Sequence, residues 1–435
     1  MKERYKMKKT ELSAEQFVVQ VGQNGNSTET LTELYQLSAF RLIHFKAFHD
    51  TNWIKINHLT LLLGENSSGK STLYQALGML SAAYHYFIQE ERFNDLARLA
   101  EEFGEFDDIC NKAAKERIVK IGFEFLRKEK RIEYWIMIAP DEKSKFGRVI
   151  NVLGRQSGFT ADFLLYYHSV NLFFMERKTG LMIPPEVQKL AVCCLSSLRK
   201  FAQSFQILAA HRYRPERVMQ LTGRKPNWIS PSGSNAYDIL YFYSKIENKN
   251  LYMLENWMNK FGYSLCWKMS GINQGQLILK EITTGRESNL IDNGFGISQS
   301  IPLALALDVL ADKTIFIDTP EAFLQTKMQS EMGDLLVEGA KKGNILAETG
   351  SEYLTLRIRR RIAEGKISNQ DVSIYYLEES EKKETTCREI ILDEDGEFQD
   401  MPESFSQFFS SDFQDIEKID EIRRKKIRDA KENRH

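Results

Sequence analysis

The residues best suited to chemistry lie in one short segment rich in glycine and serine. It reads Gly64, Glu65, Asn66, Ser67, Ser68, Gly69, Lys70, Ser71 and Thr72. The glycines let the backbone bend until its N–H groups surround an anion. Lys70 adds a positive charge for terminal phosphates, and the hydroxyl of Ser71 can bind Mg²⁺. The sequence therefore predicts a nucleoside triphosphate site that contains all of these residues.

The elements on either side of this segment have the order that such a loop needs. The mostly apolar run Leu59 to Leu63 predicts a strand before it, and Leu73 to Leu80 predicts a helix after it. The helix would present its positive end to the phosphates. An ordinary turn between a strand and a helix is the competing interpretation, and the complete motif disfavours it.

A second anion-binding loop is predicted later in the chain. Residues 292 to 300 include Gly294 and Gly296 and lead into the apolar helix Ile301 to Leu310. Exposed N–H groups at a helix start, with small hydroxyl side chains nearby, can bind an anion. One nucleotide needs one phosphate cradle, so this loop indicates that the nucleotide of another subunit is gripped. An ordinary serine-capped helix is an equally open interpretation.

Carboxylates follow two strand-like runs in the second half of the chain. Asp318 ends the first run, in a position that suits an Mg²⁺ ligand beside a phosphate loop. Glu348 ends the second run, Asn344 to Ala347. Because parallel strands end at the same edge of a sheet, we expect these two strands to be neighbours whose ends face one crevice.

The remaining pattern predicts an α/β domain that is interrupted by an insert. Strands are expected at 42–47 and 53–57, antiparallel strands at 118–126 and 131–138, and a hairpin turn at 271–275. The predicted units are a flexible extension at 1–36, the N-terminal half of the nucleotide-binding domain at 37–155, a mainly helical insert at 156–265, the C-terminal half at 266–410 and a charged helical tail at 411–435.

The composition is that of an ordinary globular protein of 435 residues. The 59 Lys and Arg residues balance 60 Asp and Glu residues, so any nucleic-acid contact would come from a local patch. No apolar run approaches a membrane-spanning length, and the start of the chain lacks the apolar stretch of a secretion signal. We therefore expect a cytoplasmic protein without membrane contact. The five cysteines match no metal-ligand spacing and are expected to be reduced thiols.

Taken together, these segments resemble the ABC/SMC-like ATPases related to RecF and to the overcoming-lysogenization-defect proteins, a branch of the bacterial AAA-type ATPases often found in phage-defence operons. The segments that match the family are the phosphate loop (Walker A) at 64–72, the signature loop at 294–300, the Walker B strand at 315–321, the switch-histidine strand at 345–352, and the segments 209–215 and 357–365. The resemblance implies an ABC/SMC-like P-loop ATPase head with a β-rich N-terminal lobe, a mixed or parallel sheet core and an α-helical insert.

The resemblance also implies the cofactors and the assembly. In this family ATP is sandwiched between the phosphate loop of one subunit and the signature loop of another, which makes a homodimer or a higher homo-oligomer. Gly296, Ser298 and Gln299 of one copy would meet the phosphates held by Lys70 of its partner. Mg²⁺ would be bound by Ser71 and Asp318.

Two residues depart from the family pattern at the hydrolytic centre. Thr319 stands where a glutamate or glutamine is expected, and a threonine hydroxyl cannot accept a proton at neutral pH. Gly350 replaces the switch histidine. Since one general base contributes roughly 10²- to 10⁴-fold to a rate, we expect Mg-ATP binding with slow hydrolysis. Glu321 or Glu348 would then be the substitute base.

The favoured function is a nucleotide-gated sensor or scaffold of an anti-phage defence system, whose ATP-bound dimer controls a separate effector such as a nuclease. The alternative is a RecF-like repair ATPase that binds DNA directly. Its candidate DNA contacts are Arg357, Arg359, Arg360 and Arg361 in one group and Arg212, Arg214 and Arg217 in another.

Overall fold

The computed structural model places the predicted site and most of its surroundings. The described residues are 36–65, 68–84, 103–127, 130–142, 145, 147–156, 159–168, 171–176, 197, 200–225, 228–380 and 384–409. Residues 1–35 of the predicted extension and the predicted tail at 411–435 lie outside these ranges, as do Asn66 and Ser67 of the phosphate loop.

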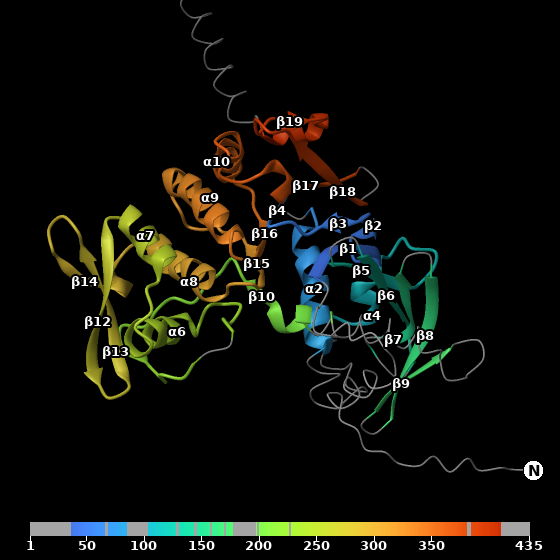
Figure 1. The fold of residues 1–435 in the computed structure, drawn as a ribbon, viewed down its shortest axis with the longest axis horizontal. Coiled ribbons are helices and arrows are strands. Elements are labelled where there is room, and N and C mark those ends of the chain that lie inside the picture. The colour runs from blue at the N-terminus through green and yellow to red at the C-terminus, as the bar shows by residue number, and fades with distance from the viewer. Residues whose placement is uncertain are drawn as a thin grey trace, which may run out of the picture.

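A mostly parallel sheet forms the centre of the molecule (Figure 1). Its strands lie in the order β10-β15-β16-β4-β17-β18-β19, and those from β10 to β17 run parallel. The bounds are β4 Leu59–Gly64, β10 Phe205–Leu208, β15 Thr314–Asp318, β16 Asn344–Glu348, β17 Val372–Glu379, β18 Thr385–Leu392 and β19 Phe398–Gln399. The strands predicted before the phosphate loop and before the two carboxylates are confirmed.

The pairing of these strands brings the predicted acids to one edge. Asp318 is the register partner of Glu348, and Glu348 is the register partner of Leu62 in β4. β16 therefore lies between the phosphate-loop strand and the strand of Asp318. The prediction that the two acid-bearing strands are parallel neighbours is confirmed.

The central sheet separates two apolar cores because successive side chains of a strand point to opposite faces. In β4, Leu59, Leu61 and Leu63 belong to one core and Leu62 to the other. Burial on both faces explains why this strand reads as a continuous apolar run. Each fully buried leucine contributes roughly 1.5–3 kcal/mol.

Different helices cover the two faces (Figure 1). The first core is built with α6 Ala236–Tyr241, η2 Phe242–Ile246, α7 Tyr252–Lys260, α8 Phe295–Val309, α9 Thr326–Ala340 and α10 Glu352–Ala363. The second core is built with α2 Lys70–Tyr84, α4 Phe106–Ile109 and a large antiparallel sheet. α2 and α8 thus pack on opposite faces of the central sheet.

The antiparallel sheet confirms the β-rich N-terminal lobe. Its strand order is β2-β1-β5-β6-β7-β8-β9, and β3 also pairs with β1. The bounds are β1 Gln36–Phe45, β2 Phe48–Asp50, β3 Ile54–Lys55, β5 Val119–Arg127, β6 Lys130–Ala139, β7 Arg148–Gln156, β8 Phe159–His168 and β9 Asn171–Glu176. Strands therefore occur at all four of the positions predicted for this lobe.

A third, smaller sheet lies beside α6 and α7, at the left of Figure 1. It consists of β11 Met219–Gln220, β12 Tyr263–Gly271, β13 Gln274–Glu281 and β14 Glu287–Asn289. The hairpin predicted at 271–275 joins β12 to β13 and is confirmed. The short helices η3 Leu290–Asp292 and η4 Asn369–Asp371 precede α8 and β17.

The expectation of a mainly helical character for 156–265 is wrong for several described segments. β8 and β9 extend the antiparallel sheet, and β10 is an edge strand of the central sheet. Helices α6, η2 and α7 occupy only the later part. Tertiary pairing overrides local helical spacing here, because these strands complete sheets that begin elsewhere in the chain. The domain boundaries themselves stay predictions.

Cys110, Cys266 and Cys387 are free thiols, whereas Cys193 and Cys194 lie outside the described residues. In the described ranges, no helix combines the length and the apolar character that crossing a membrane requires.

Candidate functional site

The phosphate loop joins the end of β4 to the start of α2. Gly64 has φ 147° and Gly69 has φ 89°, which are conformations that L side chains rarely adopt. A Cβ atom at Gly64 would lie 2.2 Å from the carbonyl oxygen of Leu377 in β17. The loop therefore needs glycine at this position for both its dihedral angle and its close approach to the next strand.

The ammonium group of Lys70 lies inside the loop. Its Nζ donates to the carbonyl oxygens of Gly64 at 2.9 Å and Glu65 at 2.6 Å. Burial lowers the pKa of Lys70, and the nearby carboxylates of Glu348 and Asp318 oppose that shift. An ammonium has three donors, so Lys70 keeps a donor for a phosphate oxygen while the carbonyls hold it in the loop.

Ser71 meets a carboxylate from the central sheet. Its Oγ lies 3.2 Å from Oε1 and 3.1 Å from Oε2 of Glu348. Sequence reasoning assigned Asp318 as the metal partner of Ser71 and Glu348 as a catalytic group. The structure places Glu348 in direct contact with Ser71 because β16 is the strand next to β4. Asp318, one strand further on, accepts a hydrogen bond from the hydroxyl of Thr319 at 2.7 Å.

These oxygen groups fit Mg²⁺, which prefers hydroxyl, carboxylate and phosphate ligands. Burial raises the pKa of Glu348 to about 7, the neighbouring Asp318 carboxylate adds to the shift, and Lys70 opposes it. A divalent cation at Ser71, Glu348 and Asp318 would relieve the repulsion between the two carboxylates. We therefore add Glu348 to the candidate ligands predicted from the sequence.

The turn after Asp318 is strained and carries the second buried glutamate. Thr319 has φ 45°, an outlier for a β-branched residue. Glu321 is buried, and its Oε1 accepts the N–H of Gly350 at 3.0 Å. Burial raises the pKa of Glu321, while backbone N–H donors oppose the shift. Glu321 thus lies in the interior and fixes the backbone that follows β16.

Gly350 is exposed and has open space where a side chain would begin. An added Cβ atom would meet nothing within 4 Å. The position of the family's switch histidine is therefore spacious and has no side chain in this protein.

The predicted signature loop forms the start of α8. Gly294 is the exposed N-cap of this helix, and an added Cβ there would also meet nothing within 4 Å. Ser298 is buried, and its Oγ donates to the carbonyl oxygen of Phe295 at 2.9 Å. This hydroxyl would have to turn away from Phe295 to meet a phosphate. Gly296 and its backbone lie against Phe323, whose carbonyl oxygen would be 2.6 Å from an added Cβ.

Gln299 and Arg212 are the residues whose role sequence reasoning did not find. Gln299 was predicted at the nucleotide, yet its side chain is fully buried and its Oε1 accepts the backbone N–H of Arg212 at 2.8 Å. Arg212 was considered only as a DNA contact, but it is 4% exposed. Its Nη2 donates to the carbonyl oxygen of Asp318 at 3.0 Å. The segment 209–215, which matches the resembled family, was the signal that could have pointed to it.

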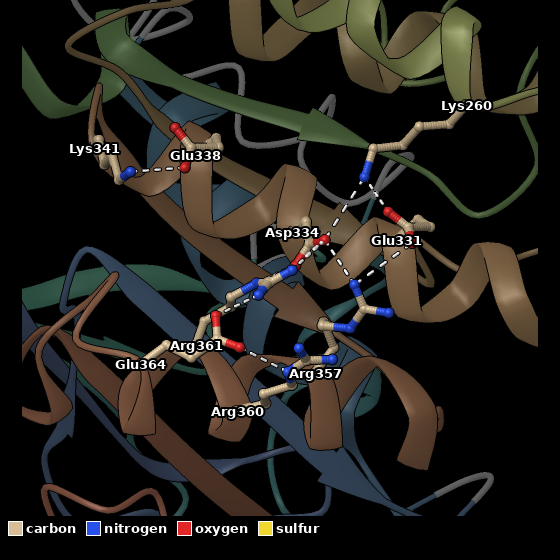
Figure 2. A network of polar contacts seen from close by, with 9 residues as sticks. All are labelled: Lys260, Glu331, Asp334, Glu338, Lys341, Arg357, Arg360, Arg361 and Glu364. Atoms are coloured by element: carbon tan, nitrogen blue, oxygen red, sulfur yellow. Dashed lines mark hydrogen bonds and ion pairs between the residues drawn. The ribbon is translucent and has the colours of Figure 1, made fainter.

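The arginines of α10 are paired with acids, as Figure 2 shows for Arg357, Arg360 and Arg361. Asp334 of α9 accepts from Arg357 at 2.7 Å and from Arg361 at 2.6 Å. In the same helix, Arg359 pairs with Glu397 and lies over the ring of Phe398. Most of this group therefore takes part in the packing between α9, α10 and the end of the sheet, while Arg360 is largely exposed. The DNA contact expected of these arginines stays a prediction.

The second arginine group is also largely occupied. Arg212 is interior, and Arg217 makes a two-pronged contact with Asp292 through hydrogen bonds of 2.8 and 2.5 Å. Arg214, the third member of the group, is exposed.

Comparison with protein families gives one match in the region of the phosphate loop. Residues 59–160 match a family described as "AAA domain, putative AbiEii toxin, Type IV TA system". The matched segment begins with β4 and includes the loop and α2. No curated protein gives a significant match to the chain.

Among solved structures, the chain is similar to heads of Smc proteins. One is the Smc head bound to the C-terminal winged-helix domain of ScpA, at 11% identity and TM-score 0.49, covering 82% of this chain and 98% of that one. Another is the SMC head domain from Thermotoga maritima, at 10% identity and TM-score 0.42, covering 82% and 100%. A third is the Smc head of Pyrococcus furiosus bound to the C-terminal domain of ScpA, at 10% identity and TM-score 0.43, covering 82% and 97%.

Proposed function

We propose that this protein is an ATPase that binds Mg-ATP, dimerises through it and hydrolyses it slowly. The observation that carries the proposal is the convergence of Lys70 and Ser71 with Glu348 and Asp318 at one edge of a parallel sheet. Lys70 binds the terminal phosphates, and the oxygen atoms of the other three residues hold the metal. The family match over residues 59–160, which include Lys70 and Ser71, supports the phosphate-loop part of this assignment.

The arrangement of α2 and α8 supports a site shared by two copies. The phosphate loop leads into α2 on one face of the central sheet, whereas the signature loop begins α8 on the other face. ATP bridging two copies would bring the exposed start of α8 to the phosphates of the partner. A ligand that binds only the closed arrangement stabilises it by differential affinity, and hydrolysis removes that stabilisation.

Three features support slow turnover. The hydroxyl of Thr319 is directed to Asp318 and cannot act as a base. Gly350 supplies no side chain. Glu348 is engaged with Ser71, and Glu321 with the backbone N–H of Gly350. Of the two glutamates predicted as substitute bases, Glu348 is the one that contacts the nucleotide-binding loop.

The biological role that we propose is control of a separate effector, such as a nuclease, in an anti-phage defence system. This role is proposed from the family resemblance of the motifs, and the matching family is described as a putative AbiEii toxin of a type IV toxin–antitoxin system. The rival role, direct DNA binding in repair, has less support because most of its candidate arginines are paired with acids and Arg212 is buried. Co-purification of a nuclease with the tagged chain would favour the first role, and salt-dependent DNA binding by the chain alone would favour the second.

Gly294 offers a sharp test of ATP-dependent dimerisation. Its backbone is not in the left-handed region and its surroundings are open, so a side chain fits there. Asp and Ser are both good N-cap residues, and both should preserve α8. Only Gly294→Asp adds a negative charge that repels the phosphates of a partner's ATP. We expect Gly294→Asp to bind ATP like the native protein but to stay monomeric in light scattering with Mg-ATP, while Gly294→Ser dimerises.

Equal dimerisation of the two variants would contradict the shared site. Failure of the native protein to bind ATP at all would contradict the nucleotide site itself. ATP binding is measured separately, with a fluorescent nucleotide, so the two failures are distinguishable.

A further inference from the structure

A buried polar cluster joins the first turns of α8 to the end of β15. Gln299 of α8 is fully buried, and its side-chain Oε1 accepts the backbone N–H of Arg212 at 2.8 Å. The guanidinium Nη1 of Arg212 returns to the carbonyl oxygen of Gln299 at 3.4 Å. Arg212 therefore binds Gln299 through both its backbone and its side chain.

The other side of the guanidinium group supports the turn that carries the acids. Its Nη2 donates to the carbonyl oxygen of Asp318 at 3.0 Å and of Thr319 at 3.4 Å. Thr319 holds an unfavourable backbone conformation, with φ 45°. Such conformations persist only where the surroundings fix them, and Arg212 supplies that support from behind the site.

The cluster also contains polar atoms that lack hydrogen-bond partners in the described part of the chain. They are Nε of Arg212, Nε2 of Gln299 and Oε2 of Glu321. Two are donors and one is an acceptor, so they are chemically complementary.

The charge of Arg212 is retained despite its burial. Burial lowers the pKa of Arg212 to about 10, and the carboxylates of Asp318 and Glu321 oppose the shift. The side chain is therefore positively charged at neutral pH and faces both acids of the turn. An arginine suits the support of this turn better than a lysine, because its planar guanidinium can hold several carbonyl oxygens at fixed angles.

We propose that Arg212 and Gln299 are positioning residues that couple the signature helix α8 to the Asp318–Glu321 turn, so that ATP hydrolysis depends on what the start of α8 contacts. A shift of the first turns of α8 moves Gln299, and Gln299 moves Arg212 and the two carbonyl oxygens that it holds. Contact with the nucleotide of a partner copy thereby adjusts the metal and catalytic acids of the same chain. This inference rests on the proposed ATP-dependent dimer.

The test separates dimer formation from turnover in two conservative variants. Arg212→Lys keeps the positive charge but loses the planar fork, and Gln299→Met keeps the volume but loses the acceptor. We expect each to form the Mg-ATP dimer with ATP affinity within about 3-fold of native, yet to hydrolyse ATP about 10-fold more slowly, because misplacement of catalytic groups lowers the rate. The double variant should lose no more than the worse single variant, since residues acting through one link are not additive.

Arg360→Lys is the matched control, because Arg360 lies on the surface of α10 and pairs with Glu364. It should leave both dimerisation and turnover unchanged. If Arg212→Lys does not fold, Gln299→Met alone carries the test.

The coupling is overturned if the two variants hydrolyse ATP at the native rate, or if their effects on turnover multiply. It is also overturned if ATP affinity, dimerisation and turnover fall together, since that pattern indicates a structural role only. A native protein that neither binds ATP nor dimerises would refute the proposed function instead.

Discussion

Two clusters of charged side chains in this protein shift the pKa values of their acids in opposite directions. Between α9 and α10, Asp334 is surrounded by Arg357, Arg361 and Lys260 (Figure 2). Burial opposes ionisation of Asp334, but the hydrogen bond from Arg361 and the other cations hold its pKa below the ordinary value. At the phosphate loop, Lys70 donates to backbone carbonyls, and burial raises the pKa of Glu348 to about 7.

The contrast shows how a structural ion cluster differs from a binding site. In the α9–α10 cluster each acid has cations at short range, so its charge is already satisfied and nothing further is needed. At the phosphate loop the acids repel one another, and the cations are held by neutral carbonyl groups. Perturbed acids of this kind are typical of functional sites, where a ligand completes the charge balance.

The largest effect is expected from removal of Lys70 in the phosphate loop, with the exposed lysine Lys341 at the end of α9 as the control. Lys70→Ala should lower ATP affinity by about 100-fold, roughly 2.7 kcal/mol, because the phosphates lose their cation. Lys341→Ala, which removes the partner of the exposed Glu338, should leave ATP affinity unchanged. Titration with a fluorescent ATP analogue measures both. Similar affinities for the two variants would refute the assignment of the phosphate loop.

Asp334→Asn should lower the stability of the folded protein without changing its nucleotide binding. It removes the carboxylate that Arg357 and Arg361 share and leaves them only Glu331 and Glu364 as charged partners. Because hydrogen bonds to charged groups are lost, we expect unfolding in urea to become easier by about 2 kcal/mol. ATP affinity should not change. Glu338→Gln on the same helix is the control and should cost less than about 0.5 kcal/mol, as for other exposed pairs. A loss of nucleotide binding in Asp334→Asn would mean that the two clusters are not independent.

The combined change Thr319→Glu and Gly350→His should raise ATP turnover by at least about 10-fold, which is less than the roughly 10²- to 10⁴-fold that one well-placed acid–base group contributes. Gly350 has open space for the imidazole, and glutamate is less strained than a β-branched residue at φ 45°. Steady-state phosphate release measures the effect, and Gly350→Ala with Thr319→Ser is the matched control. No increase over that control would contradict the account of a weakened hydrolytic centre.

Glu348→Gln should have the smallest effect, visible as a change in the pH dependence of stability. The pKa of Glu348 in the folded protein, about 7, lies above its ordinary value of 4.5, so folding favours the protonated form. Its contribution to stability is therefore complete below pH 4.5 and is lost as the pH rises through 7. In EDTA at pH 8, Glu348→Gln should be more stable than native by about 1 kcal/mol, with little difference at pH 4. Equal differences at both pH values in urea unfolding would contradict this shift.

Much of the fold could be predicted because its strongest local signals agree with its tertiary packing. β4 is buried on both faces and reads as an apolar run, and the glycines of the phosphate loop have the dihedral angles that motivated their assignment. The pairing of Asp318 with Glu348 followed from the rule that parallel strands end at a common edge.

The missed features depend on distant parts of the chain. β10 has a helical context in the sequence, and only its pairing with β15 makes it a strand. The contact of Ser71 with Glu348 follows from the position of β16 between β4 and β15, which spacing alone does not reveal. Arg212 looked like a surface cation because burial of an arginine requires carbonyl partners that come from residues far away in sequence.

Because α2 and α8 start on opposite faces of one sheet, the proposed activity would depend on the protein concentration. On the proposed mechanism no single molecule contains a complete catalytic centre, so the number of working centres grows with the square of protein concentration when the chain is dilute. Specific activity would then rise on concentrating the sample and level off once monomers are exhausted. A cell could therefore keep the proposed activity low by producing little of this protein, and raise it through accumulation or local clustering.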